Sequence, residues 1–315
     1  MNRLGSQKEP FLFIIDYNAE HAIILSPTNQ DTKNIFYSIQ GKHNLPTDDH
    51  TSFTPEIKKV FPVSFDQYKH QFERVQSEIR AGNSYLANLT CATPITLDGT
   101  LLSVFLSARA KYKLLVEDDF VVFSPETFVT IKDGIIASHP MKGTIDASIP
   151  GAREIILKDE KETAEHYTIV DLIRNDLSMV AKNVRVKRFR YVEEVKSPAK
   201  NLYQVSSEIT GTLPSDYYNY LGDVMINLLP PGSVTGAPKK KTVEILNATE
   251  SYQRGFYCGV FGYFDGVNLD SAVSIRFIEK TFQGFLYKSG GGITMYSQVE
   301  REYQEMLDKI YVPIS

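Results

Sequence analysis

The sequence is poor in cysteine and in long apolar runs, and it has no excess of positive charge. Two cysteines, Cys91 and Cys258, make neither a disulfide framework nor a closely spaced metal motif, so we expect two buried, inert thiols. The apolar stretches, such as residues 11–15, fall far short of a membrane span, and no signal-peptide apolar segment follows the N-terminus. A formal net charge of −4 offers no basic surface to nucleic acid or anionic membrane. These absences favour a cytoplasmic protein that acts on a small molecule or another protein, without a nucleic-acid or membrane partner.

The sequence does contain many strand-like segments separated by turn dipeptides. Alternating runs at 11–25, 112–124 and 127–139 recur near the C-terminus at 259–293, with turns at Asp133-Gly134, Asp265-Gly266 and Gln283-Gly284. Such hairpins make antiparallel sheet, and the regular strand-helix alternation of a doubly wound fold is missing. An apolar period over residues 65–79 predicts a helix that ends at Gly82. The prediction is an α+β fold in which antiparallel β-sheets pack together with helices on the outside.

The segment "GSVTGAPKKKTVEIL", residues 232–246, combines two glycines and two hydroxyls with a helix start. The hydroxyls of Ser233 and Thr235 and the free backbone N–H groups of the helix start make an anion site, which Gly232 and Gly236 allow a ligand to approach closely. The spacing is not that of a Walker A loop. An ordinary capped helix has the same pattern, so both interpretations stay open.

Two Glu-x-x-Glu units, Glu162/Glu165 and Glu302/Glu305, each place two carboxylates on one helix face. The first pair falls inside an apolar stripe and is expected to point inward, whereas the second flanks such a stripe with Lys309 one turn on. Inward carboxylates need a cationic partner. The two pairs could share Mg²⁺, which prefers hard oxygen ligands, or they could be two solvated, glutamate-rich faces.

Further candidates lie at the ends of strand-like runs. Glu126 follows such a run beside a proline, where it is either presented to a cleft or simply exposed. Arg276 lies in a probable strand and needs a carboxylate from the protein or a substrate. The glycines 290–292 permit close approach of a ligand, or merely end a hairpin. Lys142, between the strand-like run 134–139 and a loop opened by Gly143, is either a chemical group or a charge at a strand end.

The order of the motifs along the chain carries more information than each motif alone. The stretches "FSPETF", "HPMKGT", "EHYTIVDLIRND", "LPPGSVTGAPKKK", "GFYCGVFGYF", "SIRF", "SGGGI" and "EYQEMLDKI" together resemble those of the chorismate-utilising enzymes. The resemblance covers roughly residues 63 to 312. It implies the chorismate-binding fold, with residues 1–60 as a short N-terminal segment of the same fold that carries a β-hairpin, and residues 61–315 as the catalytic core.

Lys142 distinguishes branches of this family. Anthranilate and salicylate synthases typically carry alanine at this position, whereas aminodeoxychorismate synthases carry P-I-K-G-T, and this chain has P-M-K-G-T. The sequence is therefore similar to aminodeoxychorismate (para-aminobenzoate) synthase component I. That enzyme converts chorismate and ammonia, supplied by a glutamine amidotransferase subunit, to 4-amino-4-deoxychorismate for 4-aminobenzoate and folate biosynthesis.

Other functions stay open at this point. The chain could have the activity of anthranilate synthase component I or of another chorismate-utilising enzyme. It could instead be a lysine Schiff-base enzyme acting on a small keto acid, although the carboxylate pairs argue against that. It could also be a catalytically silent scaffold that binds a glutaminase, although such relatives are expected to lose the lysine or the carboxylates.

The resemblance also implies roles for individual residues. Glu165 and Glu305 would bind Mg²⁺ directly, with Glu162 and Glu302 nearby and acting through water. Glu126 would be the general acid that protonates the departing C4 hydroxyl of chorismate.

Lys142 would attack C2 as that hydroxyl leaves. The implied substrate contacts are Gly143, Thr144, Ser233, Thr235, Gly236, Tyr257, Arg276, Gly290, Gly291, Gly292 and Lys309. One departure is Leu86, where aminodeoxychorismate synthases typically carry glutamine. Because leucine cannot activate water, it counts against isochorismate or salicylate synthesis.

Overall fold

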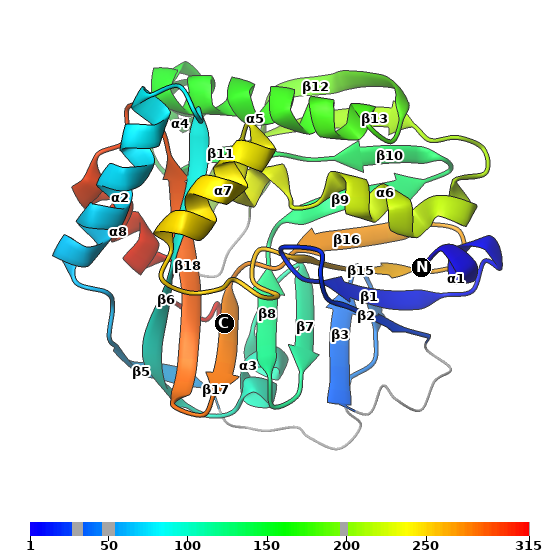
Figure 1. Ribbon diagram of the computed structural model, residues 1–315, viewed down its shortest axis with the longest axis horizontal. Helices are drawn as coiled ribbons and strands as arrows, with labels where there is room; N and C mark the ends of the chain where they lie inside the picture. Colours follow the sequence, from blue (N-terminus) through cyan, green and yellow to red (C-terminus); the bar gives the residue numbers. More distant parts are fainter. Residues whose placement is uncertain (27–33, 46–53, 196–200, 315) are drawn as a thin grey trace.

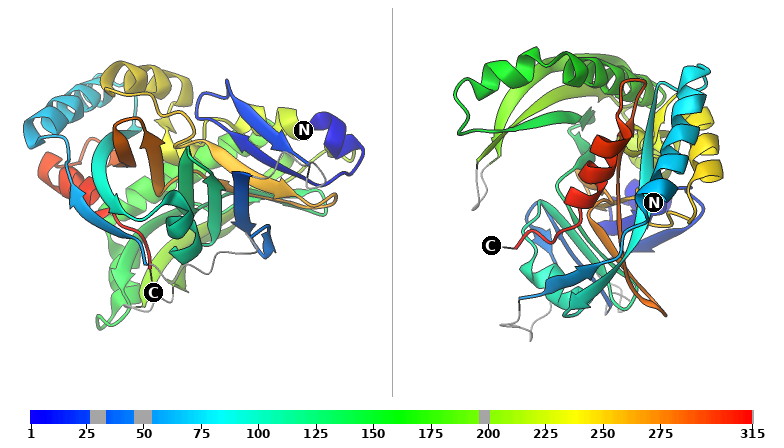
Figure 2. Two further views of the ribbon diagram at one scale, coloured as in Figure 1. Left: turned by 90° about the horizontal axis from the view of Figure 1, so that it is seen from below. Right: turned by 90° about the vertical axis from the view of Figure 1, so that its left-hand side faces the viewer.

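The computed structural model describes residues 1–26, 34–45, 54–195 and 201–314. In this part of the chain two antiparallel sheets pack against each other, and their strands cross at a steep angle in Figure 1. Helices lie outside them, as Figure 2 shows from two further sides. The predicted α+β architecture is confirmed. None of the helices in these ranges is long and apolar enough to cross a membrane.

The first sheet has nine strands within the described residues. Their order is β11 (Met141–Asp146), β13 (Leu202–Thr212), β10 (Ile135–Ser138), β9 (Thr127–Lys132), β16 (Leu269–Val273), β15 (Val260–Phe264), β1 (Phe11–Ile15) and β2 (Ala22–Leu25), with β12 (Lys182–Val195) also paired to β13.

The second sheet also has nine strands within those ranges. Their order is β14 (Gly236–Ala237), β6 (Leu86–Asp98), β18 (Gly284–Ile293), β17 (Phe277–Thr281), β8 (Phe120–Ser124), β7 (Tyr112–Val116), β3 (Ile35–Ile39) and β4 (Lys42–His43), with β5 (Glu56–Val60) also paired to β6.

The helices cover the outer surfaces and the ends of these sheets. They are α1 (Asn2–Ser6), α2 (Phe65–Arg80), α3 (Leu101–Ser107), α4 (Ala152–Lys158), α5 (Glu160–Ser178), α6 (Leu221–Leu228), α7 (Lys239–Thr249) and α8 (Val299–Asp308), with short 3₁₀ turns η2 (Tyr217–Tyr220) and η3 (Gly232–Val234). Helix α5 contacts β11, β12 and β13, whereas α8 contacts β18 of the other sheet. In Figure 1 α5 runs along the top of the molecule and α8 lies at the left.

Local sequence signals explain several of these elements. Asp133 and Gly134 both have positive φ, 51° and 73°, as the tight turn between β9 and β10 requires. Helix α2 begins with a capping box in which Ser64 and Gln67 exchange hydrogen bonds. The predicted hairpins and this helix are therefore confirmed.

The main apolar core fills the space between the sheets. It includes Phe11, Phe13, Phe120, Phe261 and Phe277, all at most 1% exposed. A second cluster lies under α2, α7 and α8, and a third lies under α3. Helix α5 packs on the first sheet and α8 on the second.

Candidate active site

A cleft of about 290 Å³ is lined by residues from both sheets. Its walls carry most of the predicted site residues: Glu126, Lys142, Gly143, Thr144, Ser233, Tyr257, Arg276, Gly290, Gly292, Glu305 and Lys309. These residues come from segments far apart in the sequence, namely the turn after β8, β11, the η3 turn, the segment before β15, the β16–β17 bend, β18 and the C-terminal end of α8. A concave site with several convergent polar groups is the usual form of a small-molecule site.

Lys142 is directed into the cleft by an irregularity in β11. The pairing of β11 with β13 shifts between Lys142 and Thr144, so Gly143 is an extra residue in a bulge. Gly143 has a φ of 80°, which favours glycine, and a Cβ there would lie 3.3 Å from Oε2 of Glu162. Glycine at position 143 therefore allows the positive φ and also leaves room for the Glu162 side chain of α5.

The Lys142 amine reaches the carboxylate of Glu165 on α5, with 3.5 Å between Nζ and Oε2. The lysine side chain is 23% exposed and that of Glu165 is 11% exposed. Nζ also lies 3.5 Å from the point that a Cβ on Gly292 would occupy, so a side chain at position 292 would crowd the amine. The lysine is thus enclosed but still accessible from the cleft.

Glu126 lies just after β8, where its carboxylate Oε1 accepts a hydrogen bond of 2.5 Å from the Ser233 hydroxyl. Burial raises the pKa of Glu126, and the Ser233 hydrogen bond and the nearby charge of Lys142 oppose that rise. A carboxyl group with a raised pKa can keep its proton closer to neutral pH, which is what a general acid requires.

Arg276 was predicted in a strand, and this prediction is wrong. The residue lies in the bend between β16 and β17 with a φ of 56°, and its carbonyl accepts a hydrogen bond from the Phe123 N–H. A positive φ is uncommon for a residue other than glycine, and here it ends the extended backbone of β16 before β17 begins. The bend turns the guanidinium to the cleft wall, where it lies 5.4 Å from the ring centroid of Tyr311.

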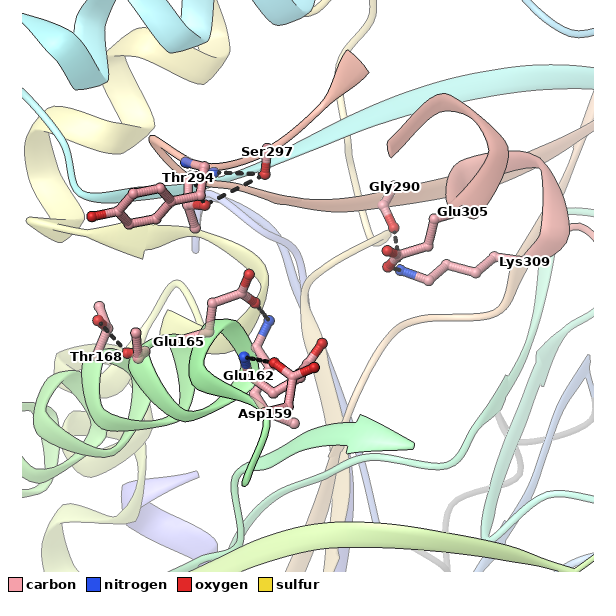
Figure 3. Close-up of polar contacts among 12 residues, drawn as sticks. Asp159, Glu162, Glu165, Thr168, Gly290, Thr294, Ser297, Glu305 and Lys309 are labelled. Atoms are coloured by element: carbon pink, nitrogen blue, oxygen red, sulfur yellow. Dashed lines mark hydrogen bonds and ion pairs between the residues drawn. The ribbon is translucent and has the colours of Figure 1, made fainter. Parts of the chain in front are cut away.

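Two lysines add positive charge to the same cleft. Lys309 donates hydrogen bonds of 2.7 Å to the Gly290 carbonyl and to Glu305, as Figure 3 shows. Lys288 was not predicted, although it lines the cleft, is 2% exposed and contacts Glu279 at 3.0 Å. Burial lowers the pKa of Lys288. Its signal was in the sequence, since residues 288, 290 and 292 alternate onto one face of β18.

The four predicted metal carboxylates come from two helices, and of the four Glu305 lines the cleft. In Figure 3, Glu162 and Glu165 project from α5 on one side and Glu305 from α8 on the other. On the α8 side, carboxylate oxygens of Glu302 and Glu305 lie 3.6 and 3.5 Å from the point that a Cβ on Gly291 would occupy. Glu302 is 3% exposed, so it does not belong to a solvated face.

This donor set fits a hard cation. It consists of carboxylates, without sulfur or imidazole, and suits Mg²⁺. A different group of possible metal ligands, Asp16, Glu20 and His21, is found elsewhere among the described residues. Its carboxylate and imidazole ligand atoms all lie within 4.8 Å of one another. There one Asp16 oxygen accepts the backbone N–H groups of Glu20 and His21, which accounts for that group as a turn after β1.

Three predicted contacts lie outside the cleft wall. Thr235 is fully buried, and Gly236 pairs with Ala87 in β6, where a Cβ would collide with the Leu86 carbonyl. Gly291 faces the glutamates of α8. Of the two hydroxyls in the predicted anion loop, the structure therefore brings only that of Ser233 to the cleft.

Comparisons with known proteins point to one family. A family model described as chorismate binding enzyme matches residues 9–315. The chain is 46% identical to an "Uncharacterized PabA-like protein" of Haemophilus influenzae, over 99% of this chain and 95% of that protein. It is 32% identical to "Aminodeoxychorismate synthase component 1" of Klebsiella aerogenes, over 79% of this chain but 57% of that protein. The crystal structure of anthranilate synthase component I from Streptococcus pneumoniae superposes with a TM-score of 0.69 at 25% identity, covering 84% of this chain and 61% of that one.

Proposed function

The chain belongs to the family of chorismate-binding enzymes, and we propose that it is an aminodeoxychorismate synthase component I. It would convert chorismate and ammonia to 4-amino-4-deoxychorismate. The observation that carries this proposal is the position of Lys142, which the bulge at Gly143 directs into the same cleft as the general-acid candidate Glu126. An amine and a carboxylic acid in one cleft are the two groups that an amination through a lysine adduct needs.

The charge of the cleft suits chorismate, which carries two carboxylates. Arg276, Lys288 and Lys309 line its walls, and Tyr257 and the backbone of Gly290 lie beside them. Arginine binds carboxylates through paired N–H donors, and lysine supplies a point charge. We assign the enolpyruvyl carboxylate to this wall. Glu165 and Glu305, supported by Glu162 and Glu302, would hold Mg²⁺, which supplies positive charge for the ring carboxylate when bound.

The first chemical step joins the substrate to the enzyme. The neutral Lys142 amine forms a bond to C2 of the ring, the ring double bonds shift, and the C4–oxygen bond breaks. Glu126 gives its proton to the departing hydroxyl, which leaves as water. The raised pKa of Glu126 favours the protonated starting form that this step uses.

The second step releases the product. Ammonia forms a bond to C4, the double bonds shift back, and the bond between C2 and the Lys142 nitrogen breaks. The proton lost by the incoming nitrogen returns to Glu126, so both residues regain their starting states. The covalent adduct divides one difficult substitution into two allylic displacements.

The product would enter 4-aminobenzoate and folate synthesis, with ammonia from a glutamine amidotransferase subunit. Overall similarity does not separate this activity from that of anthranilate synthase, since relatives of both names match the chain. Lys142 separates the two activities, because anthranilate synthases typically carry alanine at the position of Lys142. A silent scaffold would not need Glu126 and Lys142 in one cleft, and a keto-acid Schiff-base enzyme would not need the four glutamates.

The test is to incubate the protein with chorismate, ammonium chloride and Mg²⁺ and to identify the product by chromatography. We expect 4-amino-4-deoxychorismate. Anthranilate as the main product would establish the other aminating activity. Unchanged chorismate, with a folded protein, would favour the scaffold.

A further inference from the structure

The aromatic ring of Tyr311 lies against the guanidinium of Arg276, which lines the cleft. The guanidinium carbon is 5.4 Å from the ring centroid, which is within the range of a cation–π contact. Tyr311 is not itself among the residues that line the cleft, and it belongs to the segment 309–314 that follows α8. The ring therefore supports Arg276 from a side other than the cleft.

The backbones of both partners are fixed to the same pair of buried rings. Phe123 and Tyr287 are buried and make an edge-to-face contact, with their ring centroids 6.2 Å apart. The Phe123 N–H donates to the Arg276 carbonyl at 3.1 Å. The Tyr287 hydroxyl donates to the Tyr311 carbonyl at 3.0 Å. The spacing between the Tyr311 ring and the guanidinium therefore depends on a buried anchor and not on the two side chains alone.

The segment after α8 is held on both sides of Tyr311. Ile310 and Val312 pack against the apolar cluster under α3, and the Arg109 N–H donates to the Pro313 carbonyl at 2.8 Å. The Tyr311 side chain is 46% exposed, so burial of the ring does not explain its place. We conclude that an ordered backbone presents this ring to the arginine.

A ring over the face of an arginine leaves the edge of the guanidinium free. All five N–H donors of a guanidinium lie in its plane, and two of them can bind one carboxylate side by side. An acidic partner would occupy these donors and cancel the charge, as Glu279 does for Lys288 in the same cleft. A tyrosine face holds the group in place without doing either.

We infer that Tyr311 is a positioning residue for chorismate, which holds the Arg276 guanidinium in the orientation that pairs with the enolpyruvyl carboxylate. This inference rests on the proposed function, which assigns that carboxylate to this wall. A long side chain loses rotamer freedom when it binds a ligand, and one that is already held in place loses less. Tyr311 therefore raises the affinity for chorismate although it does not line the cleft.

The test compares two substitutions of Tyr311 with a matched control. Tyr311→Phe keeps the aromatic face, whereas Tyr311→Leu keeps an apolar side chain without that face. The control is Tyr191→Leu, because Tyr191 stacks on Arg188 in β12 with 3.6 Å between guanidinium carbon and ring centroid, and neither residue lines the cleft. Chorismate affinity is measured by calorimetry with Mg²⁺ and without ammonia, with Lys142→Ala in every protein so that no covalent adduct adds heat.

We expect Tyr311→Leu to weaken chorismate binding about three- to thirtyfold, as the loss of a cation–π contact implies. Tyr311→Phe and the control should bind as tightly as the Lys142→Ala parent. Equal affinities in Tyr311→Leu and Tyr311→Phe would overturn the inference, because the aromatic face would then make no difference.

Dependence on the arginine separates positioning from damage to the fold. Arg276→Met keeps the side-chain stem without the cation, and in this background Tyr311→Leu should change the affinity by less than about twofold. The same loss in both backgrounds would mean that Tyr311 acts on the fold and not through Arg276, which would overturn the inference.

The outcome is distinguishable from that of the proposed function, because binding is measured and not turnover. Unchanged affinity in Tyr311→Leu, in a protein that forms 4-amino-4-deoxychorismate, would overturn the role of Tyr311 alone. The expected losses of affinity, in a protein that forms a different product from chorismate, would support the role of Tyr311 and overturn the proposed function.

Discussion

Removing the Ser233 hydroxyl should move the pH dependence of amination in a direction that the structure fixes. The hydroxyl donates to Glu126 and stabilises the ionised carboxylate, which opposes the effect of burial on the pKa of Glu126. In Ser233→Ala the ionised form loses this donor, so the pKa of Glu126 rises further. The acid then stays protonated to higher pH, and the alkaline decline in rate moves to higher pH.

The size of the shift follows from the energy of such a bond. A hydrogen bond to a charged group contributes about 1.5–3 kcal/mol. Since one pKa unit corresponds to about 1.4 kcal/mol, the decline should move by about one to two pH units.

The assay measures initial rates between about pH 6 and pH 9 at saturating chorismate and a fixed concentration of neutral ammonia. Ser289→Ala is the matched control, because Ser289 also lines the cleft but its hydroxyl donates to the Met306 carbonyl and not to Glu126. Its decline should coincide with that of the wild type. A decline in Ser233→Ala at the same or lower pH than the wild type would refute the assignment of Glu126 as the acid.

Three further predictions concern the acid, the metal and the fold. Glu126→Gln should bind chorismate nearly as the wild type does but lower kcat about 10²- to 10⁴-fold, and an unchanged kcat would make the carboxyl merely structural. Glu165→Gln should weaken both Mg²⁺ and chorismate binding, measured by calorimetry, and turnover that survives complete metal removal by EDTA would contradict a metal site. Arg254→Met should lower the free energy of unfolding in urea by about 3–5 kcal/mol, because it leaves the buried Glu250 carboxylate without its 2.6 Å partner. Lys69→Met, which removes an exposed ion pair, should change the stability by at most about 1 kcal/mol, and equal losses would contradict the reasoning.

The sequence revealed those parts of the fold that depend on neighbouring residues. Hairpins such as β9–β10 carry their own turn signal, and α2 carries its own caps. The order of strands in the sheets was not predictable in the same way. Phe11 in β1 pairs with Phe264 in β15, and this pairing depends on packing between distant apolar segments rather than on a local pattern.

The candidate site shows the same division. Lys142 and Glu126 were identified through the order of the motifs along the chain, and both line the cleft. The loop motif did not reveal that Ser233 faces the cleft while Thr235 is buried, since the 3₁₀ turn between them sets the two directions. Nor did alternation reveal the bend at Arg276, because a left-handed backbone at an arginine has no sequence signature.

The covalent role of Lys142 is the central claim, and one measurement tests it most directly. The protein is incubated with chorismate and Mg²⁺ without ammonia, quenched with acid, digested and examined by peptide mass spectrometry. We predict a mass increase equal to chorismate minus water on the peptide that contains Lys142, and its loss in Lys142→Ala, which should bind chorismate but lose most amination. Absence of the adduct from an enzyme that aminates chorismate, together with a Lys142→Ala variant that aminates at the wild-type rate, would contradict the claim.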